Sequence, residues 1–371
     1  MDINEFIDLA KSRPLTNVYI VGEGTYGQIF GRYFDKHQIA WEGYVDRNSR
    51  QGPIHGKKVI SYREAGNEDA YYIISSYIYR DEMMKELIDC GVREDRLVLY
   101  ETKDTIYECY EDTVHWKGYT EKLKRYEGLY KGNRCFIIGN GPSLTIGDLE
   151  KLKGEITFAC NSIYALYEHT SWRPDFHCAW DEVFCKKMMS EKEDVERMTS
   201  NCEAFFTSIM SEGFAFRDCK DIRNLYYVKD VRGRDGKQGL PLFSGDCSRQ
   251  VYSSGSVTYM MLQLAVYMGF EEIYLLGMDC SYSIERHSDG SITRNDIRDY
   301  NHLIQQMEER QGMALPEEVR KHFGIFTEID AIMDGYRAAK QYADLHGIRI
   351  CNATRGGKLD IFPRADLDKV I

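Results

Sequence analysis

The sequence lacks the features that mark membrane-embedded, secreted and nucleic-acid-binding proteins. Its longest nearly apolar run, VTYMMLQLAVYMGF at 257–270, is too short to span a bilayer and contains Gln263. The opening residues MDINEFIDLAKSR are acidic and do not follow the basic-then-apolar order of a signal peptide. The net charge of −11 argues against nucleic acid as a partner, because such binding depends on neutralising phosphates. We therefore expect a cytoplasmic protein with no transmembrane segment.

Paired cysteines are absent as well. The 371-residue chain has 11 cysteines, an odd number, and no two of them form a Cys-x-x-Cys pair. This pattern predicts reduced thiols rather than a disulfide framework, and it offers no metal site. The residues that are present, 43% apolar and 29% charged, are typical of a globular protein long enough for two domains. Whether the protein forms a homo-oligomer stays open.

Two segments, 17–38 and 133–154, share one order of features. Each has an apolar run, then a glycine turn, then an amphipathic stretch. Apolar runs of this kind are typical of parallel strands that are buried on both faces. Strand-like and helix-like segments alternate after each of them. The pattern predicts an α/β protein with two Rossmann-like, doubly wound parallel-sheet domains.

The expected domain boundaries follow from this alternation. We place a Rossmann-like domain at 1–101, a helical linker at 102–132 and a nucleotide-binding domain at 133–371. The highly charged segment 283–321 interrupts the second domain, and we interpret it as a lid-like insertion. A solvated excursion of the chain would explain its composition equally well.

The first glycine turn has the spacing G-x-G-x-x-G at Gly22, Gly24 and Gly27, directly after a strand, and Asp46 ends the segment GYVD. In dinucleotide-binding domains such glycines let a pyrophosphate approach a helix N-terminus, and an acid about 20 residues later binds the ribose. The segment 21–60 resembles the small N-terminal domain of sugar-modifying acyltransferases, which binds a sugar nucleotide or nothing. Three interpretations of this turn are possible: a structural turn, a sugar-nucleotide site or an NAD site.

The second glycine turn lies in CFIIGNGPSL at 135–144. Gly139 and Gly141 lack a Cβ, so a ligand can approach the backbone, and the helix that follows favours an anion. Ser143 can cap that helix or donate to a phosphate. Asn140 offers amide donors and an acceptor. We predict a phosphate-binding floor here, although a plain strand-to-helix turn also fits.

Polar residues follow other strands of the same predicted sheet. Asn161 and Ser162 come after the next strand, and Asp181 and Asp279 end two later strands. Carboxyl ends of parallel strands share one edge, where ligands bind at the switch point. The two carboxylates could meet ribose hydroxyls, a metal or a proton there, or each could cap a turn.

Several segments follow the order seen in the MptE-like family, which the chain resembles over about 133–371. They are IIGNGPSL, FACNSIYAL, RPDFHCAWD, YSSGSVTYMMLQLAVYMGFEEIYLLGMDCSY and AAKQYADLHGIRICNAT. The family includes archaeal hydroxymethyl-dihydropterin diphosphokinases and motility accessory factors proposed to glycosylate flagellin. The same order is similar to that of the small bacterial sialyltransferases. The resemblance to these enzymes implies that Asn140 and Asn161 hold the nucleotide.

The sialyltransferase resemblance also implies that Ser253, Ser254 and Gly255 line the cytidine and the phosphate. These residues precede a helix expected to begin at Val257, so ordinary N-capping by serines is the alternative. In the sialyltransferases a tyrosine pair after the last aspartate stabilises the departing phosphate. Here Ser281 stands at the first tyrosine position and Tyr282 follows it. Asp279 and Tyr282 are therefore the catalytic candidates at this position.

Those enzymes also use a lid histidine as general base. The nearest histidine to the matching position is His322, although its spacing differs from the family's, and His302 and His287 are the alternatives. The loop VKDVRGRDGKQGLP at 228–241 can clasp phosphates or an acidic acceptor, or can be a solvated turn. Its cations are Arg232, Arg234 and Lys237.

Three functions are compatible with these residues. The first is a glycosyltransferase that uses a CMP-activated, sialic acid-like sugar in surface-glycan or glycoprotein assembly, with a glycan or protein acceptor and no required cofactor. The second is a diphosphokinase that acts on a pterin-like alcohol and needs Mg²⁺, for which Asp181 and Asp279 could be ligands. The third is a non-catalytic nucleotide-binding protein.

Overall fold

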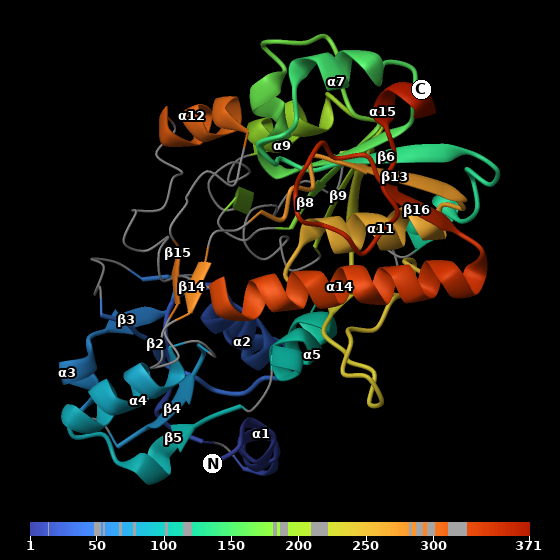
Figure 1. Ribbon diagram of the computed structural model, residues 1–371. Coiled ribbons are helices and arrows are strands. Elements are labelled where there is room, and N and C mark those ends of the chain that lie inside the picture. Colours follow the sequence, from blue (N-terminus) through green and yellow to red (C-terminus); the bar gives the residue numbers. More distant parts are fainter. Residues whose placement is uncertain are drawn as a thin grey trace. The chain divides into compact units, whose positions relative to one another are not determined.

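The chain folds as two compact units, residues 1–116 and 117–371, called here the smaller and the larger unit. Figure 1 labels the helices and strands of each unit. The computed structural model describes residues 1–13, 15–47, 53–54, 56–66, 69–76, 79–100, 103–113, 121–180, 184–185, 192–208, 222–281, 284–286, 292–294, 301–310 and 325–371.

The smaller unit is built on a five-stranded parallel sheet with the order β3-β2-β1-β4-β5. Its strands are β1 (Val18–Val21), β2 (Gly43–Val45), β3 (Lys58–Ile60), β4 (Tyr71–Ile74) and β5 (Leu97–Val98). The chain runs outward from β1 to β3 on one side and from β4 to β5 on the other. The switch point of this sheet therefore lies between β1 and β4.

Helices cover both faces of this sheet. They are α1 (Ile3–Ser12), α2 (Thr25–Lys36), α3 (Tyr62–Ala65), α4 (Arg80–Asp89) and α5 (Lys103–Thr113), and a 3₁₀ turn η1 (Glu94–Arg96) precedes β5. On one face of the sheet, α3 and α4 pack against a core that includes Tyr19 and Tyr72. On α2, Phe30 packs on Tyr100 with ring centroids 5.6 Å apart. The α5 helix packs against α2, so part of the stretch predicted as a linker lies in this unit.

The larger unit has a seven-stranded parallel sheet with the order β10-β9-β8-β7-β6-β13-β16. The strands are β6 (Arg134–Ile138), β7 (Thr157–Cys160), β8 (Phe176–Ala179), β9 (Ala204–Ser208), β10 (Leu225–Val228), β13 (Glu272–Leu276) and β16 (Arg349–Asn352). Successive strands from β7 to β10 extend away from one side of β6, whereas β13 and β16 lie on the other. This arrangement puts the switch point between β6 and β13 and confirms two Rossmann-like domains.

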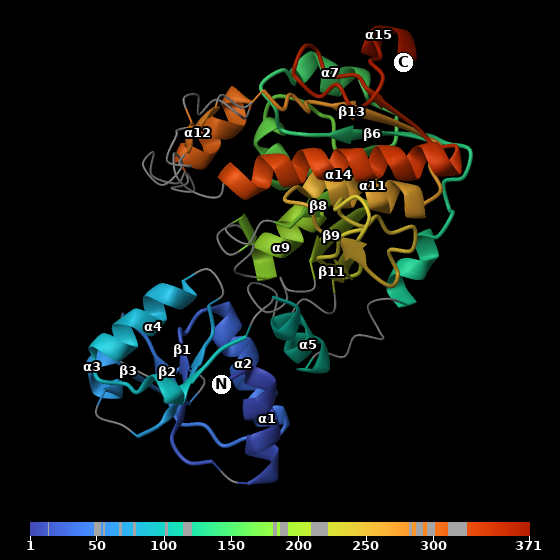
Figure 2. The same cartoon turned by 60° about the horizontal axis from the view of Figure 1, so that its bottom comes forward.

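The helices of the larger unit are α7 (Ile146–Lys151), α9 (Lys192–Thr199), α11 (Val257–Tyr267), α12 (His302–Arg310), α14 (Ile325–His346) and α15 (Leu367–Val370), with 3₁₀ turns η2 (Lys124–Tyr126) and η3 (Asn161–Leu166). Figures 1 and 2 show α11 and α14 side by side across one face of the sheet. The opposite face packs against α7, η3, α12 and α15. Both faces are therefore covered, as the apolar strands require.

Two short strand pairs complete the larger unit. The parallel pair is β11 (Asp230–Val231) with β12 (Val251–Tyr252), and the antiparallel pair is β14 (Ile284–Arg286) with β15 (Ile292–Arg294). The second pair, Asn301 and α12 are the described parts of the insertion predicted at 283–321.

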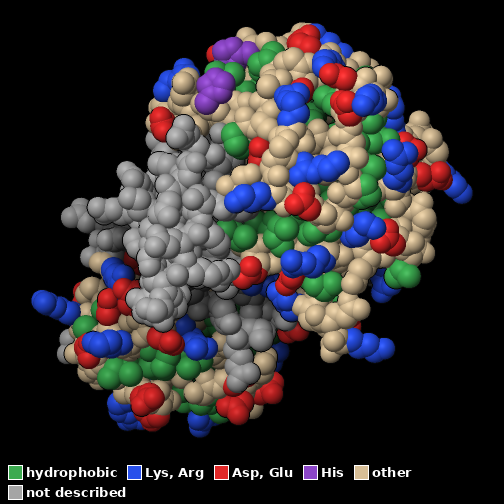
Figure 3. Space-filling model, viewed as in Figure 1, with side chains coloured by type: hydrophobic (Ala, Val, Ile, Leu, Met, Phe, Trp, Pro, Cys, Tyr) green, Lys and Arg blue, Asp and Glu red, His purple; other side chains and the backbone are tan. Residues whose placement is uncertain are grey.

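The described residues carry a surface of mixed charge and free thiols. On the face in Figure 3, cationic and anionic side chains lie interspersed over the described surface. Among the described helices, none is both long and apolar enough to cross a membrane. The ten cysteines in the described ranges are all free thiols, and most of them are buried.

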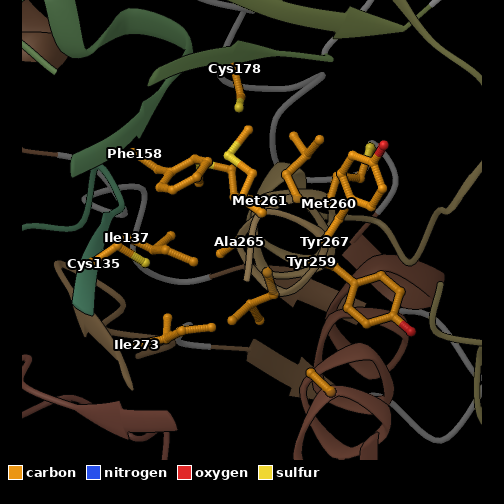
Figure 4. Close-up of a cluster of buried hydrophobic side chains, with 14 of the residues drawn as sticks. Cys135, Ile137, Phe158, Cys178, Tyr259, Met260, Met261, Ala265, Tyr267 and Ile273 are labelled. Atoms are coloured by element: carbon orange, nitrogen blue, oxygen red, sulfur yellow. The ribbon is translucent and has the colours of Figure 1, made fainter. Parts of the chain in front are cut away.

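The main core of the larger unit forms where α11 lies on the sheet. Figure 4 shows Met261 and Ala265 of α11 directed at Ile137 and Phe158 from two neighbouring strands. Leu123 and Tyr126 also belong to this core, so the chain has entered the larger unit before β6 begins. Gln263, a polar residue of this mostly apolar helix, is fully buried. It bonds to the backbone N of Ser244 and Tyr252 (3.0 and 2.8 Å) and to the backbone O of Tyr252 and Tyr259 (2.9 and 3.1 Å).

Candidate functional site

The two strand ends at the switch point are bonded tightly to each other. The Gly139 N donates to Leu276 O at 2.8 Å, and the Gly141 N donates to Gly277 O at 2.9 Å. The Asp279 carboxylate accepts from the Ser143 hydroxyl at 2.8 Å and from the Ser143 N at 3.4 Å. Since these donors of the second glycine turn already have partners at the end of β13, they are not free to cradle a phosphate.

The glycines of this turn have a packing reason to be glycine. A Cβ on Gly139 would lie 2.6 Å from Met278 Sδ, and one on Gly141 would lie 2.0 Å from Asp279 Oδ2 and 2.5 Å from Gly277 O. The turn therefore lets β6 and β13 end in contact, a reason that differs from the predicted approach of a ligand.

Ser143 does not cap the next helix, as the sequence suggested it could. The cap of α7 is Thr145, whose hydroxyl accepts from the Asp148 N, and α7 has six residues. The hydroxyl of Ser143 donates instead to Asp279, just after β13.

The carbonyl groups of the same turn bond to residues from the C-terminal third of the chain. Asn301, 3% exposed, donates its backbone N to Asn140 O and its side-chain amide to Leu144 O, both at 2.7 Å. Arg355 donates to Ser143 O at 3.1 Å and to Asp148 Oδ1 at 2.6 Å. Since both residues bond to the turn, its conformation is fixed from several directions.

Three buried polar atoms at the carboxyl ends of β6, β7 and β8 have no hydrogen-bond partner within the described part of the chain. They are Asn140 Oδ1, Asn161 Oδ1 and Trp180 Nε1. The amide nitrogen of Asn140 donates to Cys160 O at 3.1 Å, which identifies Oδ1 as the atom without a partner. Buried polar atoms in native proteins are almost always hydrogen-bonded, to protein, water or a ligand, so these two acceptors and one donor, which lie together on adjacent strand ends, are candidates for bonds to a ligand.

Asn161 has an unusual backbone and a buried neighbour. Its φ is +45°, in the left-handed region. The His177 Nε2 lies 2.9 Å from Asn161 O. Burial lowers the pKa of His177 to about 4, although the hydrogen bond to Asn161 opposes this effect. The imidazole is therefore neutral at pH 7. Ser162 is buried in η3.

The serine segment before α11 is bonded to neighbouring elements. Ser253 donates its backbone N to Val231 O at 2.8 Å, and the Ser254 hydroxyl donates to Ala331 O on α14. Gly255 has a φ of +69°, and Ser256 caps α11 by accepting from the Thr258 N at 3.1 Å. Ser256 therefore makes the N-cap that was considered for this segment as the alternative to phosphate binding.

Several sequence candidates lie outside the described residues, namely Asp181, Tyr282, His287 and His322. His302 is the first residue of α12 and is exposed. In the basic loop, Arg234 pairs with Asp334 of α14 at 3.4 Å, while Arg232 and Lys237 are exposed. Over the described ranges, no group of three or more His, Cys, Asp and Glu side chains could hold a metal ion.

The first glycine turn sits at the switch point of the smaller unit. Gly22 has a φ of +93°, Gly24 precedes the first turn of α2, and a Cβ on Gly27 would lie 2.0 Å from Gly22 O. Asp46, the predicted ribose ligand, accepts from the Glu23 N at 3.1 Å. This bond holds the carboxylate against the turn itself. It favours the interpretation of the motif as a structural turn rather than a ligand site.

Four residues of the larger site were not singled out from the sequence: Asn301, Arg355, His177 and Trp180. Asn301 carried a local signal, because an asparagine directly before a helical pattern is typical of an N-cap, and its Oδ1 accepts from the Leu303 N at 3.0 Å. The other three residues carry no local sequence signal, because their roles depend on partners far away in the sequence or on burial.

Comparison with known proteins agrees with the sequence resemblance. The family model described as 6-hydroxymethylpterin diphosphokinase MptE-like matches residues 110–285. Curated protein sequences contain no match to this chain.

Two solved structures are similar to the chain. The MAf glycosyltransferase from Magnetospirillum magneticum AMB-1 aligns with 11% identity and a TM-score of 0.35 over 98% of this chain and 61% of that protein, so the chain spans about three fifths of its length. The sialyltransferase CstII from Campylobacter jejuni, in complex with CMP-3FNeuAc, aligns with 12% identity and a TM-score of 0.35 over 62% of this chain and 85% of that protein. The resemblance to the MptE-like family is thus confirmed by the family model over 110–285, which includes every strand of the larger sheet except β16.

Proposed function

We propose that the larger unit binds a nucleotide-activated sugar and transfers the sugar to an acceptor hydroxyl. One observation carries the proposal: Asn140, Asn161 and Trp180 each present a buried polar atom without a partner among the described residues, on three adjacent strand ends. Amide oxygens accept from ribose hydroxyls or from the amino group of a base, and an indole N–H donates to a carbonyl or phosphate oxygen. A nucleotide offers all of these groups.

The proposed donor is a CMP-activated acidic sugar. This choice is supported by the sialyltransferase-like order of IIGNGPSL, FACNS and YSSGS, in which Asn140 and Asn161 stand at the nucleotide-holding positions. In the reaction, the acceptor oxygen would form the new glycosidic bond while the bond from the sugar to the CMP phosphate breaks. The phosphate keeps the electron pair, and the hydroxyl proton passes to a base.

We propose separate roles for the catalytic candidates and for the serine segment before α11. His322 would take the proton, and Tyr282 would stabilise the departing phosphate. Asp279 already accepts from Ser143 through Oδ2, so it would meet a substrate through Oδ1. Ser254 and Gly255 would approach the phosphate through the backbone, since the Ser254 hydroxyl bonds to Ala331 O. Ser253 would approach it through its hydroxyl, since its backbone N donates to Val231 O. A glycan or a protein would serve as acceptor.

A diphosphokinase is the second candidate, because the matching family model carries that description. This reaction needs Mg²⁺ to neutralise the transferred phosphates. Asp279 is a poor ligand in its present geometry, since Oδ2 accepts twice from Ser143, and within the described ranges no cluster of three metal-binding side chains exists. The described residues therefore do not fit a Mg²⁺ site. A nucleotide-binding protein without catalysis is the third candidate.

A nucleotide panel tests the proposal on the full chain. CMP, CTP, UDP and ATP, each with and without Mg²⁺, are compared by thermal shift and titration calorimetry. A ligand at 100 times its Kd stabilises the fold by about 2.7 kcal/mol, which is easily detected. We expect CMP and CTP to stabilise the protein without metal. Stabilisation by ATP only with Mg²⁺ would overturn the proposal in favour of the diphosphokinase, and no stabilisation by any nucleotide would contradict both.

Matched variants locate the binding site. Asn140→Ala is expected to weaken CMP binding about tenfold, because it removes one hydrogen bond to the ligand. Asn133→Ala is the control, since Asn133 is an exposed asparagine just before the opposite end of β6. Equal CMP affinity in both variants would place the nucleotide elsewhere.

A further inference from the structure

His177 is a buried histidine for which the proposed function assigns no role. It lies on β8, is 1% exposed, and packs on the ring of Phe205 with centroids 4.9 Å apart. Its Nε2 is 2.9 Å from the backbone oxygen of Asn161. A carbonyl oxygen only accepts hydrogen bonds, so Nε2 carries the proton and donates it.

The bond ends on a residue with a backbone that needs support. Asn161 has a φ of +45°, and a residue other than glycine adopts this region only when its surroundings hold it there. Asparagine tolerates the left-handed region better than most residues. Asn161 is also the first residue of η3, so its backbone decides where the chain turns away from β7.

The side chain of Asn161 is where this conformation matters. Its Oδ1 is buried and lacks a hydrogen-bond partner in the described part of the chain, beside the equally unpartnered Asn140 Oδ1 on the next strand end. The direction of a side chain follows from φ of its own residue, so a change of φ at Asn161 would move Oδ1 away from its present position.

We infer that His177 is a positioning residue: its Nε2–H holds Asn161 in the left-handed conformation, which presents Asn161 Oδ1 as an acceptor to an amino or hydroxyl group of the nucleotide. This inference rests on the proposed function for its ligand, although not for its geometry. His177 does not touch the nucleotide in this arrangement and acts only through Asn161.

A double-mutant cycle with CMP tests the coupling. Asn161→Gly removes Oδ1 but accepts the left-handed backbone without strain. His177→Leu removes the donor and keeps an apolar side chain in the buried site. We expect each single variant to weaken CMP binding about tenfold. We expect the double variant to bind CMP with no lower affinity than the single variant of lower affinity. Losses that multiply would overturn the inference, because they would show that the two residues act independently.

The conservative variant separates positioning from packing. His177→Gln can still donate an N–H to Asn161 O, so we expect its CMP affinity to stay within about threefold of the wild type. A merely structural role would lower the affinity of the glutamine and leucine variants alike, and that result would contradict the inference. If the leucine variant does not fold, His177→Met replaces it in the cycle.

A second measurement does not depend on any nucleotide. Crystal structures of the ligand-free wild type and of His177→Leu are compared at Asn161. We expect Asn161 to leave the left-handed region in the variant, and a φ near +45° in both structures would overturn the inference. If the wild type binds no nucleotide from the panel, the proposed function fails, whereas this comparison still decides the role of His177.

Discussion

Gly141 occupies a position where one added carbon has no room. A Cβ there would lie 2.0 Å from Asp279 Oδ2 and 2.5 Å from the backbone oxygen of Gly277. We expect Gly141→Ala to lower the free energy of unfolding by about 1–3 kcal/mol, because the ends of β6 and β13 must move apart. Urea unfolding measures this. Gly236→Ala is the control, since open space surrounds that position. Equal stability of the two variants would contradict the packing role of Gly141.

His177 predicts an acid-sensitive stability. Burial lowers its pKa to about 4, whereas the unfolded chain takes up the proton near pH 6.5. Between these pH values the unfolded state binds more protons, so the free energy of unfolding falls as the pH falls, by up to about 1.4 kcal/mol per pH unit. We expect a shallower fall in His177→Leu, measured by urea unfolding at pH 7, 5.5 and 4.5. The same slope in variant and wild type would show that His177 titrates normally.

At the scale of elements, Arg355 joins the loop after β16 to the N-terminus of α7. Its guanidinium bonds to Asp148, whose side chain is 2% exposed. Burial alone would raise the pKa of Asp148, but the hydrogen bonds from Arg355 and Thr145 outweigh burial and lower it. We expect Arg355→Gln to lower the free energy of unfolding by about 2 kcal/mol, less than for a fully buried pair because half of the Arg355 side chain is exposed.

The control for Arg355 is Arg349→Gln. Arg349 pairs with Glu272 at 3.5 Å, with both side chains exposed, and we expect its loss to change stability by less than about 0.5 kcal/mol. Thermal unfolding of both variants is the measurement. If Arg355→Gln is as mild as the control, the guanidinium does not hold the turn.

Gln263 connects α11 to β12. It bonds to both backbone groups of Tyr252 and to the Ser244 N, and Tyr252 directly precedes the serine segment. Gln263→Leu would leave these buried backbone groups without a partner, so we expect a loss of about 3 kcal/mol and faster amide exchange at Tyr252. The exposed Gln341 is the control for the same substitution. Unchanged exchange at Tyr252 would contradict the anchoring role.

At the scale of the whole molecule, each unit has its own sheet and core. We expect residues 117–371 expressed alone to unfold cooperatively and to bind CMP as the full chain does, because the candidate site uses residues of the larger unit only. Circular dichroism and calorimetry check this. A fragment without a cooperative transition, or one that folds but does not bind CMP although the full chain does, would contradict the expectation.

The sequence was sufficient for the sheets and for part of the site. Apolar strands and glycine turns predicted two doubly wound domains, and Asn140 and Asn161 were expected together because parallel strands end at one edge. The sequence could not show that Ser143 bonds to Asp279, 136 positions later, or that Arg355 bonds to Asp148 across 207 positions. Such bonds depend on which strands become neighbours. Burial of His177 likewise depends on the helices that cover β8.

One feature of the larger unit bears on how such a protein changes over evolution. The chain between Asp279 and Asn301 starts and ends on the second glycine turn, residues 139–144, since Asp279 bonds to Ser143 and Asn301 bonds to Asn140 and Leu144. Because its two ends are anchored on one turn, the intervening stretch can change in length at little cost. Each doubling of its length costs only about 0.6 kcal/mol in closure entropy. Insertions or deletions within this stretch are therefore expected to leave the turn and its bonds to Asp279 and Asn301 in place.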